Sequence, residues 1–157
     1  MPLSLLVFAF LIGVIAGLRA LTAPAVVCWA AALSWLPLEG TPLHFLASPI
    51  TRWIFTVLAV GELINDKLPK TPSRTAPPSF IVRIITGALS GAALGASQHM
   101  LVGGLIAGAI GAVAGTLGGH ACRVRLVKAT GGKDLPIALL EDAIAIIGGF
   151  LIVSHLP

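Results

Sequence analysis

Four carboxylates occupy places where an apolar sequence rarely carries charge. Glu62 and Asp66 are four residues apart, so on a helix they share one face at the end of an apolar run. Glu141 and Asp142 lie about two helical turns inside the last apolar run. Charged groups at such depth in lipid are costly unless they meet cations, water or a proton. The pattern therefore predicts a polar cavity that binds a small solute or ion, with Asp142 or Glu62 taking up a coupling proton.

Arg19 is the one charge in the first apolar stretch, residues 3–38. It lies between Gly17 and Pro24, where a proline that can start a helix predicts a break between two helices. A helix N-terminus beside a guanidinium would suit a phosphate or a carboxylate. Alternatively, Arg19 is an ordinary loop arginine that reaches for the membrane surface.

The carboxylates have a second interpretation as well. They can pair with nearby cations and only hold helix ends together close to the cytoplasmic surface. The cations in reach by this interpretation are Arg19, Lys67 and Arg123. The sequence leaves both interpretations open.

Basic residues gather in two segments. Residues 67–78 combine Lys67, Lys70 and Arg74 with hydroxyls and prolines, and Arg123 belongs to the second segment, residues 120–134. These cations can hold the phosphate of an anionic lipid headgroup. Alternatively, the first segment is a rigid connector whose charges only set the orientation of the chain.

No recognised catalytic motif accompanies these charges. The sequence has no phosphate loop of the Walker type, no zinc-protease histidine pair and no nucleophile elbow. His120 and Cys122 lack a second close pair to complete a zinc site, and Cys28 lies in a different element. A lipid enzyme with a divalent cation on the four carboxylates would still need a nucleophile. We therefore expect no enzymatic activity, no metal and no cofactor.

The composition places these residues in a membrane. Of the 157 residues, 57% are hydrophobic and 10% are charged, and the mean hydropathy is +1.01. A chain this short cannot bury so much apolar sequence in one core, so lipid must cover part of its surface. The pI of 9.7 does not indicate a nucleic-acid partner, because Lys and Arg lie in short segments between apolar runs.

The apolar runs predict an all-α, polytopic transmembrane bundle of about six helices in one domain, residues 1–157. Residues 3–38 hold two short spans or a re-entrant pair, followed by a loop at 39–47. A third helix covers about 50–66, residues 79–119 divide into two at Gln98–His99, and the sixth run is 135–156. Residues 120–134 are predicted to be a loop.

Six spans would gather nine of the ten basic residues on one side. The positive-inside rule then places the turn at Arg19 and the two basic segments in the cytoplasm, and both termini outside an inner (plasma) membrane. Five spans would scatter the charges over both sides.

Glycines spaced by four residues form stripes at Gly13 and Gly17, at 87, 91 and 95, and at 111, 115 and 119. Such stripes favour close helix packing in lipid. The halves 1–76 and 77–157 each hold three runs, which predicts a 3+3 inverted repeat of the kind found in transporters. Short matches between Gly13–Gly17 and Gly87–Gly91 support it.

The strings GLRALTAP (17–24), GELINDKLPKTPSRT (61–75) and LLEDAIAI (139–146) resemble the small bacterial membrane proteins of domain-of-unknown-function family 4126. The resemblance covers nearly the whole chain, and the middle string is the most specific. It implies a compact polytopic membrane domain, and it implies no activity. The polar residues it marks are Arg19, Glu62, Asp66, Lys67, Arg74, Glu141 and Asp142.

Two functions follow from these observations. The first is a transporter or channel-like protein for a small solute or ion, acting alone or as a homo-oligomer, with a carboxylate-lined and proton-coupled cavity. The second is a lipid-binding or scaffold membrane protein without transport activity.

Overall fold

A computed structural model gives the structure of the chain and describes residues 2–65, 77–132 and 134–156. This part of the chain is built of helices and contains no strand. The elements are α1 (Pro2–Leu18), α2 (Thr22–Ala32), the short 3-10 helix η1 (His44–Ala47), α3 (Pro49–Asn65), α4 (Pro77–Ala96), α5 (Leu101–Ala129) and α6 (Asp134–Ser154). The predicted all-α bundle is confirmed.

Three helices of the described residues are long and apolar enough to cross a membrane: Pro77–Ala96, Leu101–Ala129 and Leu135–Ser154. Two further apolar helices, α1 and α2, are shorter. Large apolar side chains lie exposed on the outside of the bundle, as expected where lipid is the solvent. The fold is therefore a membrane helix bundle, and a full crossing by each of the six helices stays a prediction.

Helices α1, α4 and α5 form the most closely packed part of the bundle. An added Cβ at Gly13 would overlap the carbonyl oxygen of Gly108, and one at Gly91 would overlap that of Gly104. The backbones approach so closely because glycine has no side chain to separate them. The predicted packing role of the glycine stripes is confirmed at these positions.

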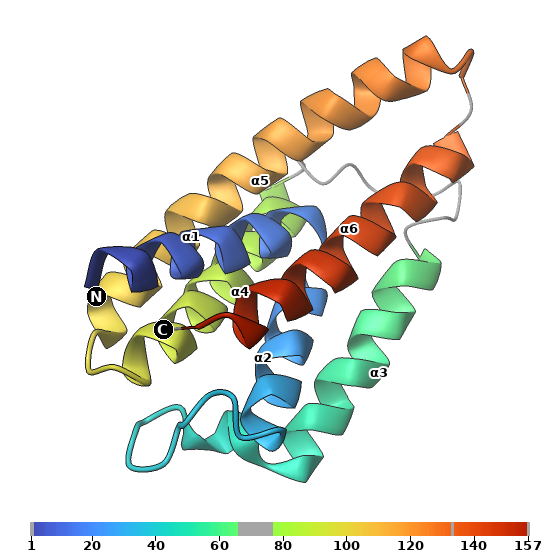
Figure 1. The fold of residues 1–157 in the computed structure, drawn as a ribbon. Coiled ribbons are helices and arrows are strands. Elements are labelled where there is room, and N and C mark those ends of the chain that lie inside the picture. The colour runs from blue at the N-terminus through green and yellow to red at the C-terminus, as the bar shows by residue number, and fades with distance from the viewer. Residues whose placement is uncertain (1, 66–76, 133, 157) are drawn as a thin grey trace.

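The remaining helices pack around this part, as Figure 1 shows. Helix α6 contacts α1, α2 and α5, and α3 packs mainly against α2 at the edge of the molecule. The inverted repeat of the two halves stays a prediction.

The predicted loop at residues 120–134 is wrong over most of its length, because α5 continues to Ala129. Residues 120–129 contain alanine, leucine, arginine and lysine, which all favour helix, and no proline. The helix ends where Gly131 and Gly132 adopt φ values of +75° and +90°, which glycine reaches without strain. Arg123 therefore lies on a helix.

The predicted divisions elsewhere are close to the observed ones. The chain breaks at residues 19–21 between α1 and α2, and it turns at residues 97–100 between α4 and α5. Helix α3 is described over Pro49–Asn65, and its predicted end at residue 66 lies outside the described residues. Three other helices, α3, α4 and α6, supply side chains to the break between α1 and α2.

Candidate functional site

The break between α1 and α2 is short and buried. Arg19 still donates its backbone N–H to the carbonyl of Ile15 at 2.8 Å, in the manner of α1, and α2 then begins at Thr22. Pro24 fits in the first turn of α2, where a backbone N–H would have no helical partner. The break leaves carbonyls at the end of α1 and N–H groups at the start of α2 that need other partners.

Arg19 is fully buried, with 0% of its surface exposed. Its Nε donates to Oδ1 of Asp142 at 2.6 Å, and its Nη2 lies 2.5 Å from the same oxygen. Nη1 lies 3.4 Å from Oε1 of Glu141. Arg19 is therefore not a loop arginine that reaches for the membrane surface. Two carboxylates of α6 hold its guanidinium inside the bundle.

Glu62 of α3 contacts the other side of the break. Its Oε2 accepts the N–H of Ala20 and its Oε1 accepts the N–H of Leu21, each at 3.0 Å. The carboxylate thus caps α2 from another helix, a role that α2's own N-cap residue, Leu21, cannot perform. A negative charge is also favoured at the N-terminal end of a helix.

Arg83 of α4 completes the arrangement, and sequence reasoning did not select it as a site residue. It is 4% exposed, and its Nη1 donates to the carbonyl oxygen of Gly17 in the last turn of α1 at 2.9 Å. A cation is favoured at this end of a helix. The available signal was that Arg83 is the only charge in the apolar stretch 79–119.

We call these side chains the charged centre: Arg19, Glu62, Arg83, Glu141 and Asp142. Of the predicted solute-binding residues, the structure gathers Arg19, Glu62, Glu141 and Asp142 around one helix break. The predicted Asp66, Lys67, Lys70 and Arg74 lie outside the described residues. Among the described residues, no three His, Cys, Asp or Glu side chains lie where they could hold a metal ion.

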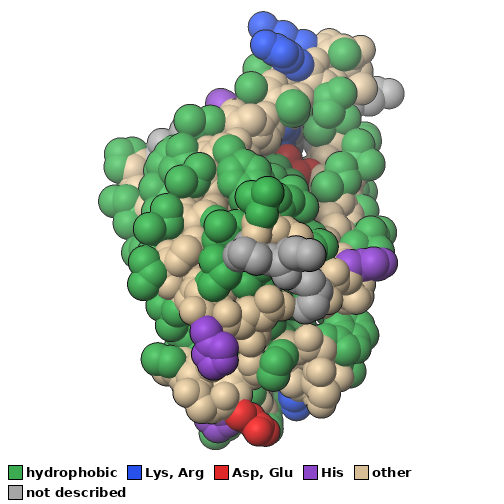
Figure 2. All heavy atoms as spheres, turned by 60° about the vertical axis from the view of Figure 1, so that its left-hand side comes forward, with side chains coloured by type: hydrophobic (Ala, Val, Ile, Leu, Met, Phe, Trp, Pro, Cys, Tyr) green, Lys and Arg blue, Asp and Glu red, His purple; other side chains and the backbone are tan. Residues whose placement is uncertain are grey.

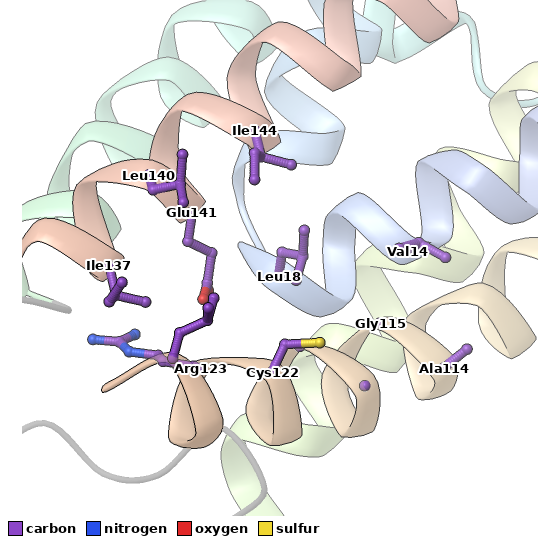
Figure 3. Close-up of a pocket in the computed structure, with 13 residues that line it drawn as sticks. Val14, Leu18, Ala114, Gly115, Cys122, Arg123, Ile137, Leu140, Glu141 and Ile144 are labelled. Atoms are coloured by element: carbon purple, nitrogen blue, oxygen red, sulfur yellow. The ribbon is translucent and has the colours of Figure 1, made fainter. Parts of the chain in front are cut away.

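A groove of about 290 Å³ lies beside the charged centre, between α1, α5 and α6. Glu141 and Arg123 both line it, and the rest of its wall is almost wholly apolar. Figure 3 shows the Glu141 carboxylate extending from α6 toward α5, and the Arg123 guanidinium turned toward Ile137. The groove therefore connects a carboxylate of the charged centre with a cation on α5.

A second hollow, of about 150 Å³, lies between α2, α3 and α6. Thr22 lines it, and the Thr22 hydroxyl is buried with no hydrogen-bond partner among the described residues. Trp29 and Thr56 line it too, joined by a hydrogen bond of 2.9 Å from the indole N–H to the hydroxyl. The groove and this second hollow thus lie on either side of the break between α1 and α2, the first at Leu18 and the second at Thr22.

Comparison with known proteins decides the family. The model of the family described as "Domain of unknown function (DUF4126)" matches residues 6–157. The chain belongs to this family. No curated protein and no solved structure matches it.

The charged centre of this DUF4126 protein carries four of the polar residues that the resemblance marks.

Arg52 lies on α3, as Glu62 does, but it stands apart from the charged centre. Its guanidinium carbon is 4.9 Å from the centre of the Trp29 ring and 6.0 Å from that of Trp53, which is a cation–π arrangement. Tryptophan and arginine together are typical of the edge of a membrane, whereas the charged centre lies inside the bundle.

Proposed function

We propose that this DUF4126 protein is a transporter or channel-like protein for a small solute or ion, and that the charged centre controls passage. The observation that carries the proposal is the fully buried Arg19 at a helix break, held by Glu141 and Asp142. Charged groups inside a membrane bundle are costly and typically mark ion or proton pathways. Discontinuous helices are also where many transporters bind their substrates.

The two carboxylates of α6 hold Arg19 unequally. Asp142 contacts it at 2.5 and 2.6 Å, whereas Glu141 lies 3.4 Å away and also lines the groove. Glu141 is therefore the less closely held of the two carboxylates. A cation or a proton on Glu141 would weaken its attraction to Arg19 and leave Asp142 as the remaining carboxylate of α6 that pairs with the guanidinium.

Glu62 offers a second point of control. Its carboxylate holds the N–H groups of Ala20 and Leu21, so a proton on Glu62 would weaken two charge-assisted hydrogen bonds at the start of α2. Because Thr22 follows directly and lines the second hollow, movement of α2 would change that hollow as well. Coupling of transport to a proton on Glu62 or Asp142 fits this arrangement.

Flux through proteoliposomes tests the proposal. The purified protein is reconstituted, and uptake of protons, Na⁺, K⁺, chloride and phosphate is measured against empty liposomes. We expect flux of at least one of these ions, reduced about tenfold or more by Glu62→Gln and Asp142→Asn. Glu39→Gln is the matched control, because Glu39 is exposed in the connection before η1. Flux that is absent, or that these variants leave unchanged, would overturn the proposal.

A second candidate function is a lipid-binding or scaffold membrane protein without transport. The observation that favours it is that both sides of the break already have partners, Glu62 at α2 and Arg83 at α1, and that Arg19 is closely paired. This function predicts that Asp142→Asn lowers thermal stability in liposomes that show no flux at all. It also predicts that neutralising Lys70 and Arg74 weakens lipid retention.

We further propose that the end of the molecule where α5 ends faces the cytoplasm of a bacterial-type inner membrane. Figure 2 shows Lys and Arg side chains gathered at the top of the view, where α5 ends. Arg125 and Lys128 of α5 are exposed there. The positive-inside rule supports a cytoplasmic position for such a cluster.

A further inference from the structure

The groove between α1, α5 and α6 has the shape and chemistry of a lipid site. Apolar side chains of α1 and α6 form two of its walls (Figure 3), and Gly118 on the α5 side faces open space. The apolar wall residues named by Figure 3 are Val14, Leu18, Ile137, Leu140 and Ile144. An apolar groove on the outside of a membrane bundle adjoins acyl chains rather than water.

The groove's length and depth match one leaflet of a bilayer. On α5 it runs from Ala114 to Leu126, which is about 18 Å at a rise of about 1.5 Å per residue. One leaflet of hydrocarbon is about 15 Å thick. Arg123 lies about 33 Å along α5 from its start at Leu101, near the full hydrocarbon thickness of about 30 Å. With the start of α5 at one face of the hydrocarbon, the Arg123 guanidinium reaches the depth of the lipid headgroups at the other face, and the groove leads from it into the hydrocarbon.

We infer that this groove binds one acyl chain of an anionic phospholipid, with the phosphate on Arg123. Arginine matches the geometry of a phosphate, and its five N–H donors allow it to bind one while keeping a contact within the protein. Glu141 lies on α6 one turn beyond Ile137 and is 3.4 Å from Arg19, whose charge it shares with Asp142. The site does not depend on transport, so it stands or falls separately from the proposed function.

Gly118 allows the acyl-chain part of the inference to be tested. A Cβ added there would meet no atom within 4 Å, although Gly118 lines the groove. Gly118→Leu therefore fills the groove without displacing a neighbouring helix. Gly61→Leu is the matched control, because Gly61 is also helical, also faces open space and lies on α3 away from the groove.

Arg123→Gln tests the headgroup part, with Arg125→Gln as its control. Arg125 is an exposed cation two residues along α5 that does not line the groove. If lipid were attracted only by the general positive charge of this helix end, both variants would weaken binding equally.

The measurement is native mass spectrometry of protein extracted from vesicles of phosphatidylcholine and phosphatidylglycerol. We expect the wild type, Gly61→Leu and Arg125→Gln to retain one phosphatidylglycerol in preference to phosphatidylcholine. Gly118→Leu should lose retention of both lipids, and Arg123→Gln should weaken retention of phosphatidylglycerol about tenfold. Excess inorganic phosphate should leave the lipid bound, because the chain supplies much of the affinity.

Three results would overturn the inference. Unchanged retention in Gly118→Leu would show that no chain occupies the groove. Equal weakening by Arg123→Gln and Arg125→Gln would remove the specific phosphate contact. Displacement of the lipid by inorganic phosphate would indicate an anion site without an acyl chain. Flux measured on Gly118→Leu separates this result from the transport proposal, which requires no lipid in the groove.

Discussion

Breaking the buried ion pair between Arg19 and Asp142 should strongly destabilise the bundle. Removing one partner of a buried pair leaves an uncompensated charge, which typically costs about 3–5 kcal/mol. Asp142→Asn keeps an oxygen that can accept from the guanidinium, and Glu141 remains 3.4 Å away. We therefore expect Asp142→Asn to lower the free energy of unfolding by about 2–3 kcal/mol, below that range.

Arg19→Met should cost more than Asp142→Asn. It leaves the neighbouring carboxylates of Glu141 and Asp142 buried without their guanidinium, each in a residue only 8% exposed. We expect a loss of about 3–5 kcal/mol. The double variant Arg19→Met/Asp142→Asn removes both charges of the close pair, so it should be more stable than Arg19→Met alone, with a coupling energy of about 1–3 kcal/mol.

The free energies are measured by titrating the protein from a mild detergent into a denaturing one and following its helical circular dichroism. Glu39→Gln again serves as the control, since it removes an exposed carboxylate far along the chain from the charged centre. The reasoning fails if Asp142→Asn costs no more than this control. It also fails if the losses of the two single variants simply add in the double variant, because a real ion pair requires coupling.

Two further changes test the packing and the ends of the helix break. Gly108→Leu should prevent folding or lower the free energy of unfolding by more than about 3 kcal/mol, because the side chain would enter the backbone of α4 near Gly87. The control Gly61→Leu should lower it by less than about 1 kcal/mol, because Gly61 faces open space. Equal losses in the same titration would contradict the packing argument. Glu62→Ala should cost about 1–3 kcal/mol by leaving two N–H groups at the start of α2 without their acceptor, and Glu62→Gln, which keeps one oxygen, should cost less. The same loss for both variants would show that the hydrogen bonds contribute little.

The sequence carried enough information to predict the membrane bundle and its main divisions. Long apolar runs identify helices in lipid, and the glycine spacing identifies their contact faces, because both are local patterns. The end of α5 was predicted too early, since basic residues were interpreted as a loop although arginine and lysine favour helix. The glycines at 131 and 132 are the actual stop.

The charged centre was only partly predictable. The position of a charge within an apolar run identified Arg19, Glu141 and Asp142 as candidate site residues, because such a charge is unusual whatever it contacts. Their pairing joins residues 123 positions apart, and no local pattern encodes which carboxylate meets which cation. The contacts of Glu62 and Arg83 were harder still, because their partners are backbone groups that become available only when α1 breaks.

The break also explains why these charges can be tolerated inside the bundle. A helix that ends in lipid leaves N–H and carbonyl groups without partners, and each costs several kcal/mol. Here α3 supplies Glu62 to the start of α2, and α4 supplies Arg83 to the end of α1. Helix α6 supplies the two carboxylates that hold Arg19 within the break itself.

One short segment is therefore tied to three other helices, and each tie is charged. A rotation of α2 relative to α1 must stretch the contact of Glu62, the contact of Arg83 or the pair with Asp142. The contacts of Glu62 and Asp142 weaken when their carboxylates are protonated, and a competing ion can weaken the contact of Arg83 as well. The residues that stabilise the break are thus the same residues through which a proton or a solute could move it, so a stabilising role and a role in transport are compatible in this arrangement. Flux measured beside unfolding free energy, on the same variants, separates the two roles.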